Sequence, residues 1–195
     1  MTDLNPIIAD RFTEHLEVFG KTMEHMDTIQ EIAYRCKAAL ENGNKILFCG
    51  NGGSAADSQH LAAELICRFK KERRSLAGIA LTTDTSALTA IANDYDFESV
   101  FARQVEGLGR TGDVLIGIST SGNSKNVVKA AEIARSIGMH TIAFTGEGGG
   151  KLGELCDITL AIPSNVTARI QEMHILAGHI TVSYTHLRAH ETTLH

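Results

Sequence analysis

Ser119-Thr120-Ser121-Gly122-Asn123-Ser124 follows directly on the apolar run at residues 114–118, and a helical pattern at residues 126–137 follows it. This order predicts a strand that ends in small hydroxylated residues and then opens a helix. In such a turn, several Ser/Thr hydroxyls and the free N–H groups of the first helical turn converge on one point. We therefore expect a binding cup for an anion here.

A second turn of the same kind lies earlier in the chain. Gly50-Asn51-Gly52-Gly53-Ser54 follows the strand-like residues 45–49 and precedes another helical pattern. Two anion cups in one small domain favour a phosphorylated small molecule as the ligand.

The residues around these turns predict an α/β fold in which apolar strands alternate with helices. The strand patterns are continuous apolar runs, as expected when helices cover both faces of a parallel sheet. We expect a three-layer αβα sandwich with a five-stranded parallel sheet, of the doubly wound, flavodoxin-like kind, which binds ligands at the carboxyl ends of its strands. The expected strands are 45–49, 78–81, 114–118, 141–144 and 158–162, and the expected helices are 54–69, 85–92, 98–107, 126–137 and 167–182.

The first forty residues carry apolar side chains at helical spacing. They predict two helices that break near Gly20, with Gly43 as the C-cap of the second. A helix this apolar often packs on another subunit, so we expect the N-terminal helices to serve oligomerisation. Residues 1–182 form the expected single domain. Residues 183–195 lack an apolar stripe and are interpreted as a non-native or disordered tail, and residues 146–150 as a flexible turn.

Composition narrows the class of protein. The chain has 195 residues, 43% of them hydrophobic and 21% charged, with a net charge of −5, which is ordinary for a globular protein. Basic residues cluster only at residues 70–74, read as a solvated loop, so nucleic-acid binding is disfavoured. No run is long and apolar enough for a membrane span or a signal peptide, which favours the cytoplasm. The four cysteines show no CxxC spacing and are expected to be free thiols.

His60 and Glu64 lie four residues apart on the helix that opens at the first cup, and so share one face. This pair suits a divalent metal or a proton transfer, although an exposed helix face also carries such residues. His179 lies among apolar residues in the last helix, where a histidine is either a hydrogen-bonded core residue or a catalyst. Asn93 and Asp94 end an otherwise apolar helix, as a capping turn or a contact to sugar hydroxyls.

Taken together, the motifs resemble the sugar-isomerase (SIS) domain family, and within it the bacterial phosphoheptose isomerases. The resemblance covers about residues 10–181. The serine segment alone indicates only an SIS domain. The segments at residues 60–64 and 169–174 narrow the resemblance to the heptose enzymes. The segments that carry it are Cys49-Gly50-Asn51-Gly52-Gly53-Ser54, His60-Leu61-Ala62-Ala63-Glu64, Ala92-Asn93-Asp94, Gly117-Ile118-Ser119-Thr120-Ser121-Gly122-Asn123-Ser124 and Arg169-Ile170-Gln171-Glu172-Met173-His174.

The resemblance implies a role for each matching residue. Ser119, Thr120, Ser121 and Ser124 would hold the substrate phosphate. The sugar would be contacted by Asn51, Gly52, Gly53, Ser54, Asn93, Asp94 and Gln171. Glu64 and His179 match the acid/base pair, and His60, Glu64, Gln171 and His179 match the ligands of one zinc ion per subunit.

Geometry limits that ligand set. Gln171 and His179 are eight residues apart, about 12 Å along a straight helix. They converge on one ion only if the helix bends, if the side chains reach far, or if a second subunit contributes. The family's homotetramer, with sites at subunit boundaries, makes the last option reasonable.

The resemblance also implies the reaction, which interconverts sedoheptulose 7-phosphate and D-glycero-D-manno-heptose 7-phosphate through an enediol, for lipopolysaccharide precursor synthesis. The main alternative is a non-catalytic SIS protein that senses a phosphosugar or binds a replication initiator. Such a protein would not need Glu64 and His179 together. A third possibility is an isomerase for another phosphosugar, such as an arabinose or hexulose phosphate.

Overall fold

Five parallel strands form one sheet in the order β2-β1-β3-β4-β5. The computed structural model describes residues 4–67 and 72–185. All five predicted strands are present, with ends that differ from the expected ones by at most one residue. The strands are β1 (Ile46–Gly50), β2 (Gly78–Ala80), β3 (Val114–Ser119), β4 (His140–Thr145) and β5 (Ile158–Ala161).

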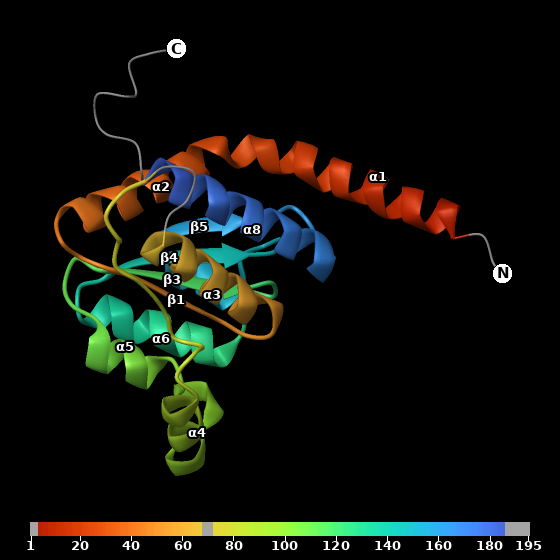
Figure 1. Ribbon diagram of the computed structural model, residues 1–195. Helices are drawn as coiled ribbons and strands as arrows, with labels where there is room; N and C mark the ends of the chain where they lie inside the picture. Colours follow the sequence, from red (N-terminus) through yellow and green to blue (C-terminus); the bar gives the residue numbers. More distant parts are fainter. Residues whose placement is uncertain (1–3, 68–71, 186–195) are drawn as a thin grey trace.

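Helices cover both faces of the sheet and confirm the three-layer αβα architecture (Figure 1). Helices α2, α3 and α8 lie on one face, and α5, α6 and α7 lie on the other. The α-helices are α1 (Asn5–Thr22), α2 (Met26–Glu41), α3 (Gly53–Ile66), α4 (Thr85–Asp94), α5 (Ala102–Leu108), α6 (Lys125–Ser136), α7 (Gly150–Leu155) and α8 (Thr167–Tyr184). The 3₁₀ turns are η1 (Met23–His25) and η2 (Phe97–Ser99).

Successive strand residues point to opposite faces of the sheet and so feed two separate cores. Phe48 and Phe144 pack under α2, α3 and α8. Leu47 and Leu115 pack under α5, α6 and α7. Since both faces are apolar, each strand reads as a continuous apolar run, which is why the sequence predicts the strands well.

Two helices stand out from this body (Figure 1). Helix α1 projects beyond the sheet, and α4 protrudes on the side of α5 and α6 without a single buried residue. The outer surface of α1 is strongly apolar. Its exposed apolar residues are Leu4 just before the helix, Ile7, Ile8, Phe12, Leu16 and Phe19.

Some element boundaries differ from the predicted ones. The N-terminal helices break at η1 rather than at Gly20, where the helix runs on without interruption. The expected helix at 98–107 is η2 followed by α5. The expected flexible turn at 146–150 leads into α7, which begins at Gly150. Gly43 ends α2 as predicted, with a φ of +80° that favours glycine.

Helix α8 extends two residues past the expected domain boundary at residue 182. Tyr184 packs edge-on against Tyr34 of α2, with ring centroids 4.9 Å apart. The rest of the expected tail, residues 186–195, lies outside the described residues, as do the last residues of the expected helix 54–69 and Lys70 and Lys71 of the basic run.

The sequence predicts a solvated loop at residues 70–74, but Arg73 is half-buried. It donates to the backbone carbonyls of Glu64 and Leu65, and so closes the carboxyl end of α3. Among the helices of the described residues, none combines the length and apolar character needed to cross a bilayer.

Candidate functional site

The two predicted cups lie side by side at the point where the strand order reverses. Strands β1 and β3 are neighbours, with Gly50 opposite Ile118, and the chain leaves them toward opposite edges of the sheet. Ligands of doubly wound folds bind at this switch point. The glycine loop (Gly50–Ser54) and the serine loop (Ser119–Ser124) therefore form one site.

Three hydroxyls converge in the serine loop. The Ser119 Oγ lies 2.9 Å from the Ser124 Oγ and 3.4 Å from the Ser121 Oγ. Ser124 is the N-cap of α6 and makes no side-chain capping bond, so its hydroxyl stays with this cluster. Hydroxyl donors at the positive end of a 12-residue helix suit a phosphate.

The turn within the serine loop depends on glycine. Gly122 has a φ of +65°, and a Cβ there would collide with the carbonyl of Gly149. The Leu152 N–H donates to the Gly122 carbonyl, and the Gly146 N–H donates to the carbonyl of half-buried Thr120. The start of α7 therefore supports the serine loop from behind, which explains why a glycine-rich stretch is ordered there.

The glycine loop turns directly into α3. Gly52 adopts a φ of +56° and Ser54 is buried in the first turn, where its N–H donates to the Asn51 carbonyl. A Cβ on Gly53 would collide with the Gln171 amide nitrogen. The structure thus brings Gln171 from α8 against the glycine loop.

The side-chain amides of Asn51 and Asn126 join the two loops. The Asn51 Nδ2 donates to the Asn126 Oδ1 at 2.9 Å, and the Asn126 Nδ2 donates back to the Asn51 Oδ1 at 2.8 Å. Sequence reasoning missed Asn126. Its only signal in the sequence is a polar amide in the first turn of a helix, at a position on the apolar face of that helix.

His60, Glu64 and His179 come together within one subunit. The His60 Nε2 lies 2.9 Å from the His179 Nε2 and 3.5 Å from the Glu64 Oε1. A close approach of α3 and α8 produces this contact, because Gly178 packs against Leu61 where a Cβ would be 2.7 Å from the leucine methyl carbons. His179 is therefore half-buried and part of a cluster of polar groups.

Asp57 lies one turn before His60 on the same face of α3. Burial raises the pKa of its carboxyl, and the charge of His60 opposes this shift. Its Oδ2 is buried and has no hydrogen-bond partner among the described residues. Sequence reasoning missed this carboxyl, although its i,i+3 spacing to His60 was visible.

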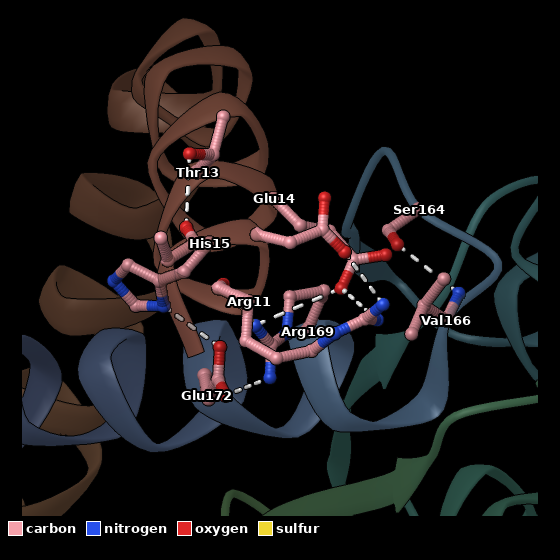
Figure 2. A network of polar contacts seen from close by, with 10 residues as sticks. Arg11, Thr13, Glu14, His15, Ser164, Val166, Arg169 and Glu172 are labelled. Atoms are coloured by element: carbon pink, nitrogen blue, oxygen red, sulfur yellow. Dashed lines mark hydrogen bonds and ion pairs between the residues drawn. The ribbon is translucent and has the colours of Figure 1, made fainter. Parts of the chain in front are cut away.

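A polar network holds the start of α8 against α1 (Figure 2). Arg169 is buried and donates to the Arg11 carbonyl at 2.6 Å, and its guanidinium pairs with Glu172 at 2.7 Å. Glu172 also lies 2.7 Å from the His15 Nδ1. Because Arg169 and Glu172 flank Gln171, this network fixes the turn of α8 that contacts the glycine loop.

The donor set fits zinc in its chemistry. Two imidazoles and a carboxylate are ligands that a catalytic zinc ion accepts, with a further position open for water or substrate. As they stand, the His60 Nε2 is hydrogen-bonded to the His179 Nε2 and lies 3.5 Å from the Glu64 carboxylate. No three such side chains among the described residues surround a common point at metal-ligand spacing. A bound ion would therefore replace the contact between the two imidazoles.

Gln171 does not join the three other expected zinc ligands in this arrangement. Its amide lies at Gly53, seven residues before His60 on α3, which is about 10 Å along the helix. Its place at the glycine loop suits the substrate contact expected of it, and its role as a ligand stays a prediction.

Asn93 and Asp94 are exposed at the end of α4, and the Asn93 amide donates to the Asp94 carboxylate at 2.8 Å. None of their hydrogen bonds within the described residues reaches either loop. The sugar contact expected of them stays a prediction.

Comparison with known proteins identifies the family of this chain. The SIS domain family matches residues 10–146. The chain is 61% identical to a phosphoheptose isomerase of Aliarcobacter butzleri over 173 residues, which cover 88% of this chain and 92% of the relative. A phosphoheptose isomerase of a Nitratiruptor species is 58% identical over 90% of this chain and 95% of its own.

A solved structure shares the fold closely. The phosphoheptose isomerase from Neisseria gonorrhoeae superposes with a TM-score of 0.88 at 47% identity, over 94% of this chain and 98% of the other. The family model covers residues 10–146, and the relatives extend the similarity in sequence and fold to about nine-tenths of the chain. The chain therefore belongs to the phosphoheptose isomerase family of SIS-domain proteins.

Proposed function

We propose that this chain is an aldose–ketose isomerase that interconverts sedoheptulose 7-phosphate and D-glycero-D-manno-heptose 7-phosphate, in the synthesis of heptose precursors of lipopolysaccharide. Membership of the phosphoheptose isomerase family supports it. The observation that carries the chemistry is the meeting of Glu64, His60 and His179, in a domain whose serine loop gathers three hydroxyls at the amino end of α6.

Binding comes first in this proposal. The phosphate sits among the hydroxyls of Ser119, Ser121 and Ser124, at the amino end of α6, with Thr120 beside them. The carbon chain then extends past the glycine loop and Gln171 toward His60 and Glu64. Because the phosphate is far from the carbons that react, the serine loop supplies affinity and orientation rather than chemistry.

The reaction moves one proton between two carbons. Glu64 removes a proton from C1 of the ketose, while His179 donates a proton to the C2 carbonyl oxygen, and a cis-enediol results. Glu64 then returns its proton to C2, and the C1 hydroxyl gives its proton to His179 as the aldehyde forms, so both groups regain their starting protonation states. A positioned acid or base contributes on the order of 10²–10⁴-fold to the rate. The opposite assignment of base and acid uses the same geometry.

Zinc held by His60, Glu64 and His179 would polarise the carbonyl and stabilise the enediolate. Gln171 would be a fourth ligand only if its side chain moved from Gly53 or a second subunit contributed it. A carboxylate that binds zinc is a weaker base, so these two duties of Glu64 compete.

The same geometry argues against a non-catalytic SIS protein. A phosphosugar sensor or a replication-initiator-binding protein needs the serine loop but has no use for a glutamate and two histidines in contact. Here a close helix packing, with Gly178 against Leu61, brings His179 to His60. The structure of the last helix therefore supports the enzyme.

We further propose a homotetramer in the cytoplasm. The exposed apolar residues of α1 need a covering surface, and a hollow of about 440 Å³ lies between α1 and α8, lined by Ile8, Phe12 and Glu172 among others. Two buried free thiols, Cys36 and Cys49, suit a reducing compartment. Light scattering should give four chains per particle, and Phe12→Glu should lower that number.

A coupled assay with sedoheptulose 7-phosphate tests the function, with arabinose 5-phosphate and a hexulose phosphate as competing substrates. We expect turnover of the heptulose at a kcat/KM at least tenfold above that for either competitor. Turnover of a competitor alone would move the chain to the third possibility, and binding without turnover of any would support the sensor.

A further inference from the structure

The paired amides of Asn51 and Asn126 are the starting point. They lie 75 residues apart in sequence and form two reciprocal hydrogen bonds of 2.9 and 2.8 Å. Asn51 belongs to the glycine loop after β1, and Asn126 to the first turn of α6 after the serine loop. The pair therefore spans the switch point between β1 and β3, where the ligand binds.

The burial of Asn126 holds this amide pair in one arrangement. Its side chain is only 3% exposed, beside Val127 of the core under α6. A buried amide needs its hydrogen bonds, because an unpaired donor or acceptor in such a place costs free energy that no water recovers. Asn51 supplies both partners at once, so neither side chain can turn without breaking both bonds.

We propose that Asn126 is a positioning residue that fixes the glycine loop relative to the serine loop through the side chain of Asn51. This inference rests on the proposed function. The serine loop holds one end of the substrate, and the glycine loop begins α3, which carries His60 and Glu64. The position of His60 and Glu64 relative to the bound phosphate therefore depends on this amide pair. A misplacement of catalytic groups on the order of 1 Å can cost about 10²-fold in rate.

Asn126→Ala and Asn126→Leu test the role of the amide pair. The second variant is close in shape to asparagine and keeps the core filled while it removes both hydrogen bonds. We expect kcat to fall at least about tenfold in both, with KM changing less than threefold, because the serine hydroxyls stay in place. Asn51→Ala and the double variant complete a cycle, in which the Asn126 substitution should have little further effect once Asn51 is gone.

Asn44→Ala is the matched control. Asn44 also bridges the segments of β1 and β3 by its side chain, through the Thr111 carbonyl and the Asp113 carboxylate, but at the opposite end of the strands. Its loss should lower thermal stability and leave kcat and KM within about twofold of wild type. A purely structural role for Asn126 would give the same result as this control.

Two outcomes overturn the inference: an unchanged kcat in the folded Asn126→Leu variant, or effects of Asn51→Ala and Asn126→Ala that multiply in the double variant. Failure of the proposed function looks different, since the wild-type chain would then not turn over sedoheptulose 7-phosphate. In that case binding of inorganic phosphate, measured by calorimetry, would still report on the serine loop alone.

Discussion

His60 and His179 face each other through their Nε2 atoms at 2.9 Å, although 119 residues separate them in the chain. The first lies on α3 and the second on α8, and Glu64 lies 3.5 Å from the same His60 nitrogen. Two helices that each carry a weak motif thus bring their polar side chains into one cluster.

Zinc binding should depend on both histidines. Metal analysis of the purified protein should show about one zinc per subunit, and His60→Ala and His179→Ala should each lower that content, since loss of a ligand or of its hydrogen-bonded support typically costs about 10-fold or more in affinity. His25→Ala, in η1, is the control and should keep its zinc. Full zinc content in both site variants would contradict the ligand assignment.

Loss of the serine hydroxyls should weaken substrate binding far more than it slows the chemistry. The double variant Ser121→Ala with Ser124→Ala should raise KM about tenfold or more, because charge-assisted bonds to the phosphate are lost, while kcat changes little. Ser136→Ala, at the far end of the same helix, is the control. An unchanged KM in the double variant would remove the phosphate from the serine loop.

Gly53→Ala should disturb the site without unfolding the protein. The added Cβ would collide with the amide of Gln171, whose flexible end can move away. We expect a melting temperature near that of wild type and a loss in kcat/KM of about tenfold. Gly107→Ala, where a Cβ meets open space in α5, should keep full activity. Equal activity in both variants would show that the place of Gln171 does not matter.

Stability should fall as the pH drops through the range from about 6.5 to 4. Burial lowers the pKa of His174 to about 4, although its hydrogen bond with the Thr145 carbonyl at 2.9 Å opposes this shift. The unfolded chain binds this proton at a pKa near 6.5, so it takes up more protons than the folded chain in that window and the free energy of unfolding decreases.

The size of this effect is about 3 kcal/mol across the window. Thermal melts at pH 7.5, 6 and 4.5 check it against His174→Gln, which should start from a lower stability but lose less on acidification. An identical pH slope in the two proteins would show that another group is responsible.

The sequence predicts the sheet almost to the residue, because strands buried on both faces are short continuous apolar runs, and their length and the turn residues that bound them separate them from helices. It missed α7, since Gly148, Gly149 and Gly150 read as a turn. That helix forms because Leu152 is fully buried and its N–H binds the carbonyl of Gly122, and neither contact can be seen in a local pattern.

The sequence predicts the single residues of the candidate site but not the contacts between its distant segments. Single residues such as Glu64 and Ser121 follow from motifs. Contacts between distant segments, such as Asn126 with Asn51, depend on how β1 and β3 pair and how deep a side chain lies. The position of the Gln171 amide against Gly53 likewise depends on how α8 packs on α3.

The most direct test of the whole account is the turnover of sedoheptulose 7-phosphate by wild type and Glu64→Gln, followed by proton NMR in heavy water, with Glu132→Gln of the α6 surface as the control. We expect isomerisation with deuterium entering at the reacting carbon in wild type and control. In Glu64→Gln we expect a rate at least about 10²-fold lower, with substrate affinity retained. Near-wild-type turnover by Glu64→Gln would contradict the central role of this carboxylate.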